Sequence, residues 1–316
     1  MRNAVRPRPA AVMLLAIAAT LLATVVLASG AAGPSQAAAG TGVIRAVGAE
    51  NQYGNVIAQV GGAYVRVTSL LKNPSTDPHD FEASAAVARQ VGQARLVVQN
   101  GLGYDSFMNS IEAATPNGGR AVIDVQRLLG LPDATPNPHL WYDPDTMPKV
   151  AAAIAADLSR IEPRHAAYFR ARARTFTRSL TAWRTALGRF ASAHRGARVA
   201  STEPVADYLL NAAGADNMTP WSFQAAMMNG TDPSPQAVAA EKALISQRKV
   251  DALVYNEQVT DPMTTSLITL ANQHHVPVVG VYETMPEPGF DYQSWMLAET
   301  SALRRAITDR TSSEHL

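Results

Sequence analysis

Four side chains that can bind metal follow the ends of segments that the sequence predicts to be β-strands. They are His79, His139, Glu203 and Glu283, and consecutive members are 60, 64 and 80 residues apart. The carboxyl ends of the strands in an open α/β sheet form the edge at which ligands bind. A single histidine or glutamate in a loop is usually solvated or hydrogen-bonded, so it is the shared position of all four that predicts a metal site.

The donor types restrict the choice of metal. Two neutral imidazoles and two carboxylates around a divalent ion sum to zero net charge, which allows the ion to be dehydrated and buried. Mixed nitrogen and oxygen ligation suits Mn²⁺, Zn²⁺ or Fe²⁺, whereas Cu⁺ prefers sulfur. The chain has no cysteine, which excludes disulfides, iron–sulfur clusters, thiolate zinc sites and cysteine nucleophiles.

An alternation of short strands and longer helices must position these residues. In the first half we expect strands at 44–47, 65–70, 96–99 and 121–124, with helices at 53–60, 84–91 and 104–113. In the second half we expect strands at 198–201, 252–255 and 276–281, with helices at 205–213, 234–246, 262–272 and 292–308. This order predicts an α/β fold of two open α/β lobes with mainly parallel sheets.

The segment between the two halves, residues 163–195, has the pattern of a long helix. It has no proline after its first residue and a single glycine, Gly188, and its aromatic and leucine residues recur at helical spacings. At 1.5 Å per residue it would be roughly 45–50 Å long, too long for one compact lobe. A coiled-coil arm is the weaker interpretation, since no regular heptad is present. We therefore expect lobes at 41–162 and 196–316, joined by one long rigid helix, with a ligand cleft between the lobes.

Residues 1–40 have the pattern of an export signal. Three arginines precede an uncharged run at residues 10–28, and small residues follow it. The run is close to the length that spans a bilayer, so an uncleaved membrane anchor is the alternative to a cleaved signal peptide. Without those three arginines, 24 of the 27 basic residues remain against 26 acidic ones, which gives no reason to expect nucleic-acid binding. We expect the rest of the chain to be exported.

Five short segments, taken in order, carry a resemblance to a known family. They are Asp77-Pro78-His79-Asp80-Phe81-Glu82, Asn100-Gly101-Leu102-Gly103-Tyr104, Asn137-Pro138-His139-Leu140-Trp141-Tyr142-Asp143-Pro144, Thr202-Glu203-Pro204-Val205 and Glu283-Thr284-Met285-Pro286. Together they resemble the metal-specific substrate-binding proteins of ABC transporters, the zinc and manganese uptake receptors. The resemblance runs from about Ile44 to Ala306, and several motifs in one order make it more specific than any single motif.

The resemblance implies two α/β lobes joined by one long rigid helix, with the metal held between them. His79, His139 and Glu203 match the first three ligand positions of the family, and Glu283 stands where the fourth is usually an aspartate. Zinc receptors often carry a third histidine where Glu203 stands and a long histidine-rich loop before the second ligand. This chain has neither, which favours Mn²⁺. Zn²⁺ stays open because nitrogen and oxygen sites usually bind it more tightly than Mn²⁺.

The leading functional hypothesis is an extracytoplasmic receptor, monomeric and without enzymatic activity. It would capture Mn²⁺ or Zn²⁺ and deliver the ion to an ABC permease that works with a cytoplasmic ATPase. The alternative is a secreted metal-dependent hydrolase that uses the same His/Glu cluster, although four protein donors leave no open position for a catalytic water. A third hypothesis, an adhesin or lipid-surface protein that merely retains the fold, predicts no tight metal binding.

Residues beside the candidate ligands have supporting roles in this interpretation. Asn256, Glu257 and Gln258 follow a predicted strand, and we expect them either to orient the ligands or to form an ordinary polar start of a helix. Trp141 and Tyr142 are expected to pack beneath the loop that carries His139 rather than to touch an ion.

Overall fold

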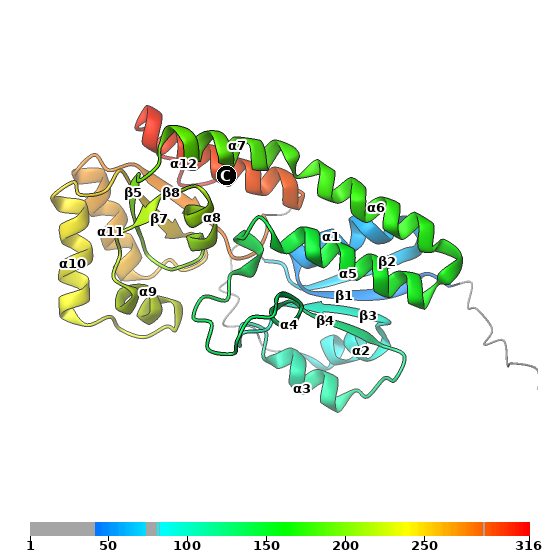
Figure 1. Cartoon of the computed structure of the whole chain (residues 1–316). Helices are drawn as coiled ribbons and strands as arrows, with labels where there is room; N and C mark the ends of the chain where they lie inside the picture. Colours follow the sequence, from blue (N-terminus) through cyan, green and yellow to red (C-terminus); the bar gives the residue numbers. More distant parts are fainter. Residues whose placement is uncertain (1–41, 74–80, 82, 287) are drawn as a thin grey trace, which may run out of the picture. The chain divides into compact units, whose positions relative to one another are not determined.

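The computed structural model describes residues 42–73, 81, 83–286 and 288–316 (Figure 1). The chain from Thr41 to Leu316 forms one compact unit. The described residues of this unit contain two four-stranded sheets, in which neighbouring strands pair in parallel. The prediction of an α/β fold with two parallel-sheet lobes is confirmed.

The first lobe contains a sheet with the strand order β2-β1-β3-β4. Its strands are β1 (Ile44–Glu50), β2 (Val65–Leu71), β3 (Leu96–Gln99) and β4 (Ala121–Asp124). Its helices are α1 (Asn51–Gly61), α2 (Ala85–Gln93), α3 (Phe107–Ala114), α4 (Val125–Leu129) and α5 (Thr146–Ile161). Because all pairs are parallel, the loops that follow the strands meet at one edge of the sheet.

The second lobe repeats this topology with the order β6-β5-β7-β8. Its strands are β5 (Arg198–Ser201), β6 (Asp216–Asn217), β7 (Ala252–Asn256) and β8 (Val278–Val281). Its helices are α8 (Asp207–Ala212), α9 (Trp221–Met228), α10 (Pro235–Ser246) and α11 (Pro262–Gln273), and α12 (Tyr292–Asp309) follows the last strand. In each lobe the first strand therefore lies between the second and the third.

Local sequence signals account for most of these elements. The strands expected at 96–99, 121–124 and 198–201 have those bounds in the structure. Helix α10 begins as its sequence predicts, since Ser234 accepts a hydrogen bond from the backbone N–H of Ala237 at 3.2 Å and Pro235 occupies the first turn. Strand β6 was not predicted, because two residues are too short for a periodic signal.

The expected long helix is built from two helices in succession, α6 (Ala166–Ser179) and α7 (Thr181–Ala193). Only Leu180 separates them, and the backbone there stays near the helical region. The hydroxyls on either side of it bond to preceding carbonyls, Ser179 to Phe176 and Thr181 to Arg178, both at 2.7 Å. Such side-chain bonds compete with the helical ladder and account for the break.

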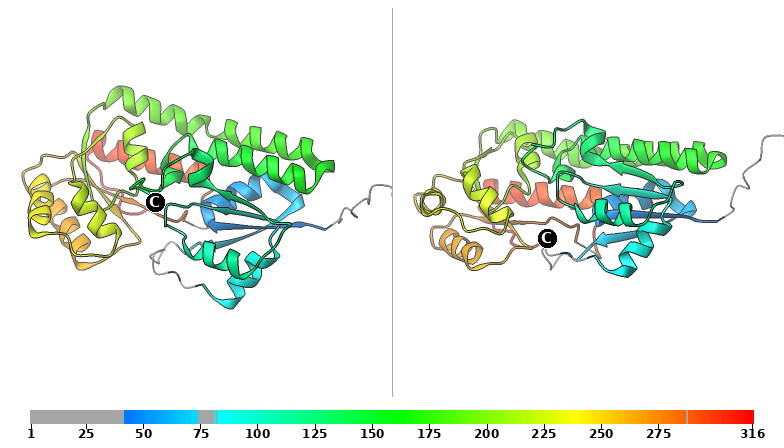
Figure 2. Two further views of the ribbon diagram at one scale, coloured as in Figure 1. Left: turned by 60° about the horizontal axis from the view of Figure 1, so that its bottom comes forward. Right: turned by 90° about the horizontal axis from the view of Figure 1, so that it is seen from below.

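The two helices run along both lobes (Figure 2). Helix α6 packs on α1 and α5 of the first lobe, and α7 packs on α12. The inward face is the predicted apolar stripe, in which Phe169, Phe176, Leu180, Trp183, Leu187 and Phe190 are buried. Trp183 also donates a hydrogen bond from Nε1 to Oγ1 of Thr300 in α12 at 3.0 Å. A single hydrophobic cluster therefore continues from the first lobe through these helices into the second.

In the described part of the chain, no helix combines the length and the apolar character that crossing a membrane requires.

Candidate metal centre

The structure describes three of the four predicted ligands, and all three are buried in loops that follow strands. Glu203 lies shortly after the end of β5 and Glu283 shortly after the end of β8. His139 precedes a short 3₁₀ turn, Leu140–Tyr142, in the long connection after β4. The exposed fractions of His139, Glu203 and Glu283 are 0%, 3% and 0%. His79 lies outside the described residues.

A chain of close contacts connects these three side chains. Nε2 of His139 lies 3.5 Å from Oε2 of Glu283. The amide nitrogen Nδ2 of Asn256, the last residue of β7, donates to Oε1 of Glu283 at 2.6 Å and to Oε2 of Glu203 at 3.3 Å. Within the described ranges, however, no three His, Asp or Glu side chains are close enough to hold one metal ion together.

Asn137 fixes the ring of His139. Its Oδ1 accepts hydrogen bonds from the backbone N–H of His139 at 3.0 Å and from Nδ1 at 2.7 Å. Its Nδ2 donates to the carbonyl of Pro204 at 2.8 Å, which determines the orientation of the amide. Because Oδ1 can only accept, Nδ1 of His139 is the ring nitrogen that donates, which leaves Nε2 as the ring nitrogen for a metal. A metal binds imidazole through an unprotonated nitrogen, and Nε2 faces Glu283.

The backbone and side chain of Glu283 are both held by the surrounding amides and a tyrosine. Oε1 of Gln258 accepts from the backbone N–H groups of Glu283 at 2.7 Å and of Thr284 at 2.8 Å. Gln52 donates to the carbonyl of Glu283 at 3.2 Å, and the hydroxyl of Tyr104 donates to Oε2 at 2.8 Å. These contacts match the orienting role expected of Asn256 and Gln258, whereas the carboxylate of Glu257 contacts His315 instead.

A tight loop after β3 positions Tyr104. Gly101, Leu102 and Gly103 all have positive φ, at 82°, 53° and 80°. A Cβ on Gly101 would also lie 2.8 Å from Cβ of Gln126, so that position requires glycine. The carboxylate of Asp105 accepts from the backbone N–H groups of Asn100 and Gly101 at 2.6 and 3.0 Å. Burial raises the pKa of Asp105 to about 6, and these backbone bonds oppose the shift.

Aromatic rings form the wall behind His139. Trp141 is fully buried, and its ring makes edge contacts with His139 at a centroid distance of 5.4 Å and with Tyr104 at 5.1 Å. The hydroxyl of Tyr142 donates to the carbonyl of Tyr282 at 2.9 Å. The expectation that Trp141 and Tyr142 pack beneath the loop is confirmed. The rings of Trp141 and Tyr104 exclude water from one side of the imidazole.

Side chains of each lobe also bond to the backbone of the other. Asn51 donates to the carbonyl of Met285 at 2.7 Å and accepts from its N–H at 2.9 Å. The hydroxyl of Tyr208 in α8 donates to the carbonyl of Asn137 at 3.0 Å. Together with the bond from Asn137 to Pro204, these contacts connect the loops of both lobes around the candidate ligands.

Sequence reasoning assigned no role to Tyr104 or Asn137. The signal for Tyr104 was present in the Gly101-Leu102-Gly103 run, which indicates a constrained loop directly before it. For Asn137 the sequence offers only an asparagine two positions before His139, and its role depends on the carbonyl of Pro204, which lies far along the chain.

The two parallel-sheet lobes have the fold of a class of periplasmic metal-binding proteins. The family model of ZnuA, described as zinc-uptake complex component A, periplasmic, matches residues 47–306. Since this match spans most of the chain, the protein belongs to the ZnuA family.

Individual relatives and solved structures agree with the family. The chain is 26% identical over 136 residues to the manganese-binding lipoprotein MntA of Bacillus subtilis, covering 41% of this chain and 44% of that protein. It is 24% identical over 200 residues to the zinc-binding protein TroA of Treponema pallidum, covering 60% and 62%. The chain thus spans less than two thirds of either relative. The fold is also similar to the substrate-binding protein FpvC of Pseudomonas aeruginosa in complex with Mn²⁺, with a TM-score of 0.70, 22% identity and coverage of 84% and 98%.

Proposed function

We propose that this protein is an extracytoplasmic receptor that binds Mn²⁺ or Zn²⁺ and delivers the ion to an ABC permease with its cytoplasmic ATPase. The observation that carries this proposal is the buried ring of His139, whose Nδ1 is bonded to Asn137 and whose Nε2 faces the carboxylate of Glu283. Glu203 is connected to the same carboxylate through Asn256.

The electrostatics of the loops support a cation as the ligand. Two ionised carboxylates at positions 203 and 283, both buried, are unfavourable unless positive charge or hydrogen bonds compensate them. The amide of Asn256 supplies part of that compensation by donating to both. A divalent ion at the same carboxylates would balance their full charge, with His139 as a nitrogen ligand and His79 as the proposed fourth ligand.

The relatives support a binding function rather than catalysis. MntA and TroA are described as manganese-binding and zinc-binding proteins, and FpvC as a substrate-binding protein with Mn²⁺. A hydrolase would need an open metal position and a general base beside it. Nothing in the family or its relatives favours that alternative.

The donor set supports both metals, and affinity alone does not decide the cargo. The carboxylate at position 203 adds a hard oxygen ligand, which suits Mn²⁺. A nitrogen and oxygen site nevertheless usually binds Zn²⁺ more tightly than Mn²⁺. We therefore propose Mn²⁺ as the transported ion, with Zn²⁺ the stronger competitor for the isolated protein.

Metal analysis and calorimetry on residues 41–316 test this function. We expect one Mn²⁺ or Zn²⁺ per chain and displacement of bound Mn²⁺ by Zn²⁺ in a competitive titration. His274, which lies between α11 and β8, provides a matched control: His274→Ala should leave stoichiometry and affinity unchanged. Absence of stoichiometric uptake of either ion by the folded protein would refute the proposal.

A further inference from the structure

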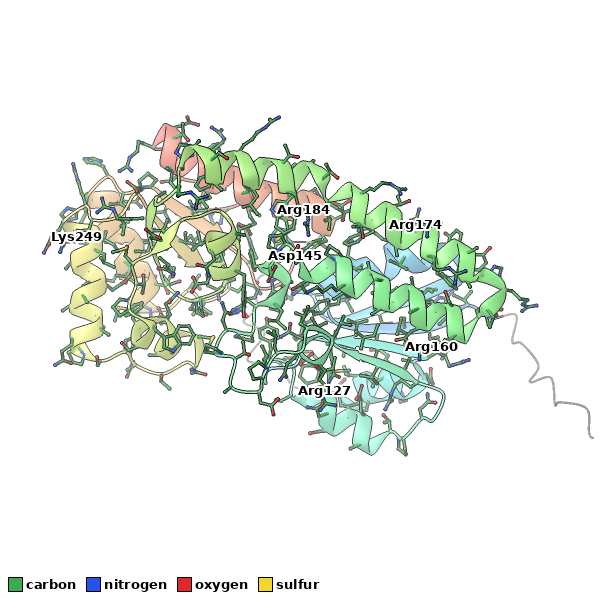
Figure 3. All side chains as sticks on the ribbon, viewed as in Figure 1. Arg127, Asp145, Arg160, Arg174, Arg184 and Lys249 are labelled. Atoms are coloured by element: carbon green, nitrogen blue, oxygen red, sulfur yellow. The ribbon has the colours of Figure 1, made fainter. Side chains whose placement is uncertain are left out.

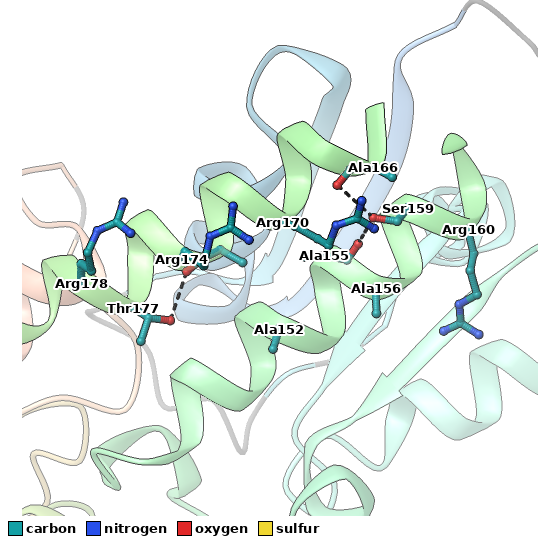
Figure 4. Close-up of a pocket in the computed structure, with 11 residues that line it drawn as sticks. Ala152, Ala155, Ala156, Ser159, Arg160, Ala166, Arg170, Arg174, Thr177 and Arg178 are labelled. Carbon is teal, nitrogen blue, oxygen red and sulfur yellow. Dashed lines mark hydrogen bonds between the residues drawn. The ribbon is translucent and has the colours of Figure 1, made fainter. Parts of the chain in front are cut away.

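An open groove of about 850 Å³ lies between helices α5 and α6, away from the candidate metal centre (Figure 4). Its floor is formed by the small apolar side chains of Ala152, Ala155, Ala156 and Ala173. Four arginines, Arg160, Arg170, Arg174 and Arg178, also line the groove, and Arg160 is paired with Asp157 of its own helix. We call this feature the arginine groove.

Helix α6, on one side of the groove, carries charge of one sign. Residues 163–195, which include α6 and α7, contain no aspartate or glutamate. They contain Arg164, Arg170, Arg172, Arg174, Arg178, Arg184, Arg189 and Arg195. The whole chain has a formal charge of only +1, so this segment concentrates positive charge on one side of the unit. In Figure 3, Arg160 and Arg174 extend from the two helices that form the groove.

Some of these arginines have structural partners, including Arg178, which donates to Oγ1 of Thr175 at 3.1 Å. Arg172 donates to the carbonyl of Gln59 at 2.8 Å, and Arg184 pairs with Asp145 at 2.7 Å. Arg170, Arg174 and Arg178 are exposed, and no carboxylate of the described residues lies within ion-pair distance of them. Their spacing of four residues puts all three on one face of α6. Three uncompensated guanidinium groups therefore line one edge of an apolar floor.

We propose that the arginine groove docks the protein on an anionic membrane surface. In this arrangement Arg170, Arg174 and Arg178 bind the phosphate groups of acidic phospholipids, for which planar guanidinium is suited because it forms two parallel hydrogen bonds. The alanine floor contacts the apolar part of the same lipids. Binding here does not involve the described candidate ligands, since His139, Glu203 and Glu283 do not line the groove.

Two observations favour a lipid surface over an acidic protein partner or free phosphate. A protein partner presents charges of both signs, so the surface that binds it needs acids as well as bases to match them. Residues 163–195 contain no acid. A uniform anionic plane matches such a segment. Free phosphate would use the arginines but not the apolar floor, and a phospholipid uses both.

Vesicle flotation tests the proposal with residues 41–316, which form one compact unit. We expect binding to vesicles of phosphatidylcholine mixed with phosphatidylglycerol, weakening as salt is added, and little binding to phosphatidylcholine alone. Each arginine near an anionic surface contributes about fivefold in binding, so the triple variant Arg170→Gln/Arg174→Gln/Arg178→Gln should bind on the order of a hundredfold more weakly. Its metal affinity should equal that of the wild type, which excludes misfolding.

A charge-matched control separates the groove from net charge. The triple variant Arg89→Gln/Arg248→Gln/Lys249→Gln removes the same charge from exposed positions elsewhere and should keep most of the vesicle binding. Ala152→Glu places an acid on the exposed floor and should weaken vesicle binding. Equal losses in the two triple variants would overturn the proposal, as would equal binding to neutral and acidic vesicles. Saturable binding of inorganic phosphate without vesicle binding would also overturn it.

Discussion

The two lobes share one sheet topology but hold the candidate ligands in different ways. In the second lobe, Glu203 and Glu283 follow almost directly on the buried strands β5 and β8. In the first lobe, the chain runs from the end of β4 at Asp124 through a helix and a loop before it reaches His139. The second lobe therefore positions its donors in loops that directly adjoin a sheet, whereas the first positions His139 through side-chain hydrogen bonds, above all from Asn137.

This difference concerns how far each donor can move. A residue adjacent to a buried parallel strand shares the rigidity of the sheet. A residue in a loop is as rigid as the contacts that hold it, and the orientation of a ligating imidazole depends on the partner of its second nitrogen. We infer that substitution of a residue that supports a ligand lowers metal affinity more when the ligand is in the first lobe than when it is in the second.

Removal of His139 should have the largest effect on the metal. If four ligands share a binding free energy of the size seen in structural metal sites, the loss of one costs roughly a thousandfold in affinity. We expect His139→Ala to lose tight Mn²⁺ and Zn²⁺ binding in calorimetry while its circular dichroism spectrum stays that of the wild type. Unchanged affinity would contradict the proposed site, and His274→Ala serves as the control.

The second lobe also contains a buried carboxyl that makes its stability depend on pH. Burial raises the pKa of Glu241 to about 8 from a usual 4.5, opposed by a hydrogen bond from Thr219 at 3.2 Å. Because the pKa is higher in the folded state, this group stabilises the fold at low pH, and that contribution is lost as the pH rises from about 4.5 to 8. Glu241→Gln should therefore be more stable than the wild type at pH 8, by on the order of 2–4 kcal/mol.

Urea unfolding of both proteins at a series of pH values measures this difference. We expect the advantage of Glu241→Gln to shrink as the pH falls and to vanish below 4.5, where the wild-type carboxyl is protonated in both states. The variant Asp232→Asn changes an exposed acid of the same lobe and should show the pH dependence of the wild type. A constant difference across the pH range would mean that Glu241 does not titrate between the two states.

Loss of Asn137 tests the side-chain support of the first lobe. Asn137→Ala removes the acceptor for Nδ1 of His139 and the bond to Pro204, so the imidazole loses both its tautomer preference and its orientation. Partners of this kind are worth 10- to 100-fold in metal affinity. We expect a loss in that range by competitive titration, smaller than for His139→Ala. A loss below twofold would show that the loop backbone alone orients the ring.

The sequence predicted the fold more completely than the site. Strands such as Leu96–Gln99 and Arg198–Ser201 are apolar runs bounded by polar residues, so their signal is local. Helix α9 (Trp221–Met228) was not predicted, because its apolar residues are not confined to one face. The break at Leu180 was also not predicted, because it depends on which backbone carbonyls accept hydrogen bonds from the hydroxyls of Ser179 and Thr181.

For the site, the sequence could indicate donors but not their surroundings. Glu203 and Glu283 were predicted because they follow strands, and their role as ligands stays a prediction, as does that of His79. The contact of Asn256 with both glutamates joins residues that are distant along the chain. Such contacts are set by the packing of the two lobes, and a single sequence contains no periodic signal for them.

Tyr104 provides the smallest and sharpest test of the comparison between the lobes. It is the first-lobe side chain that donates to the second-lobe carboxylate, at 2.8 Å from Oε2 of Glu283. Tyr104→Phe keeps the ring packed on Trp141 and removes only the hydroxyl, so we expect roughly a tenfold loss of metal affinity, the effect of one hydrogen bond to a charged group.

The matched control for this change is Tyr255→Phe, which also removes one tyrosine hydroxyl bond, here to the carbonyl of Glu314 at 2.9 Å. Gln258 and Gln52 hold the backbone of Glu283. If that backbone positions the carboxylate, the loss of metal affinity in Tyr104→Phe stays small and appears as faster dissociation of the metal. If the loss equals that of Asn137→Ala, the second-lobe donor depends on the first lobe as strongly as His139 does. The contrast between strand-held and loop-held ligands would then be wrong, because a ligand fixed by its sheet cannot respond to a single distant hydroxyl.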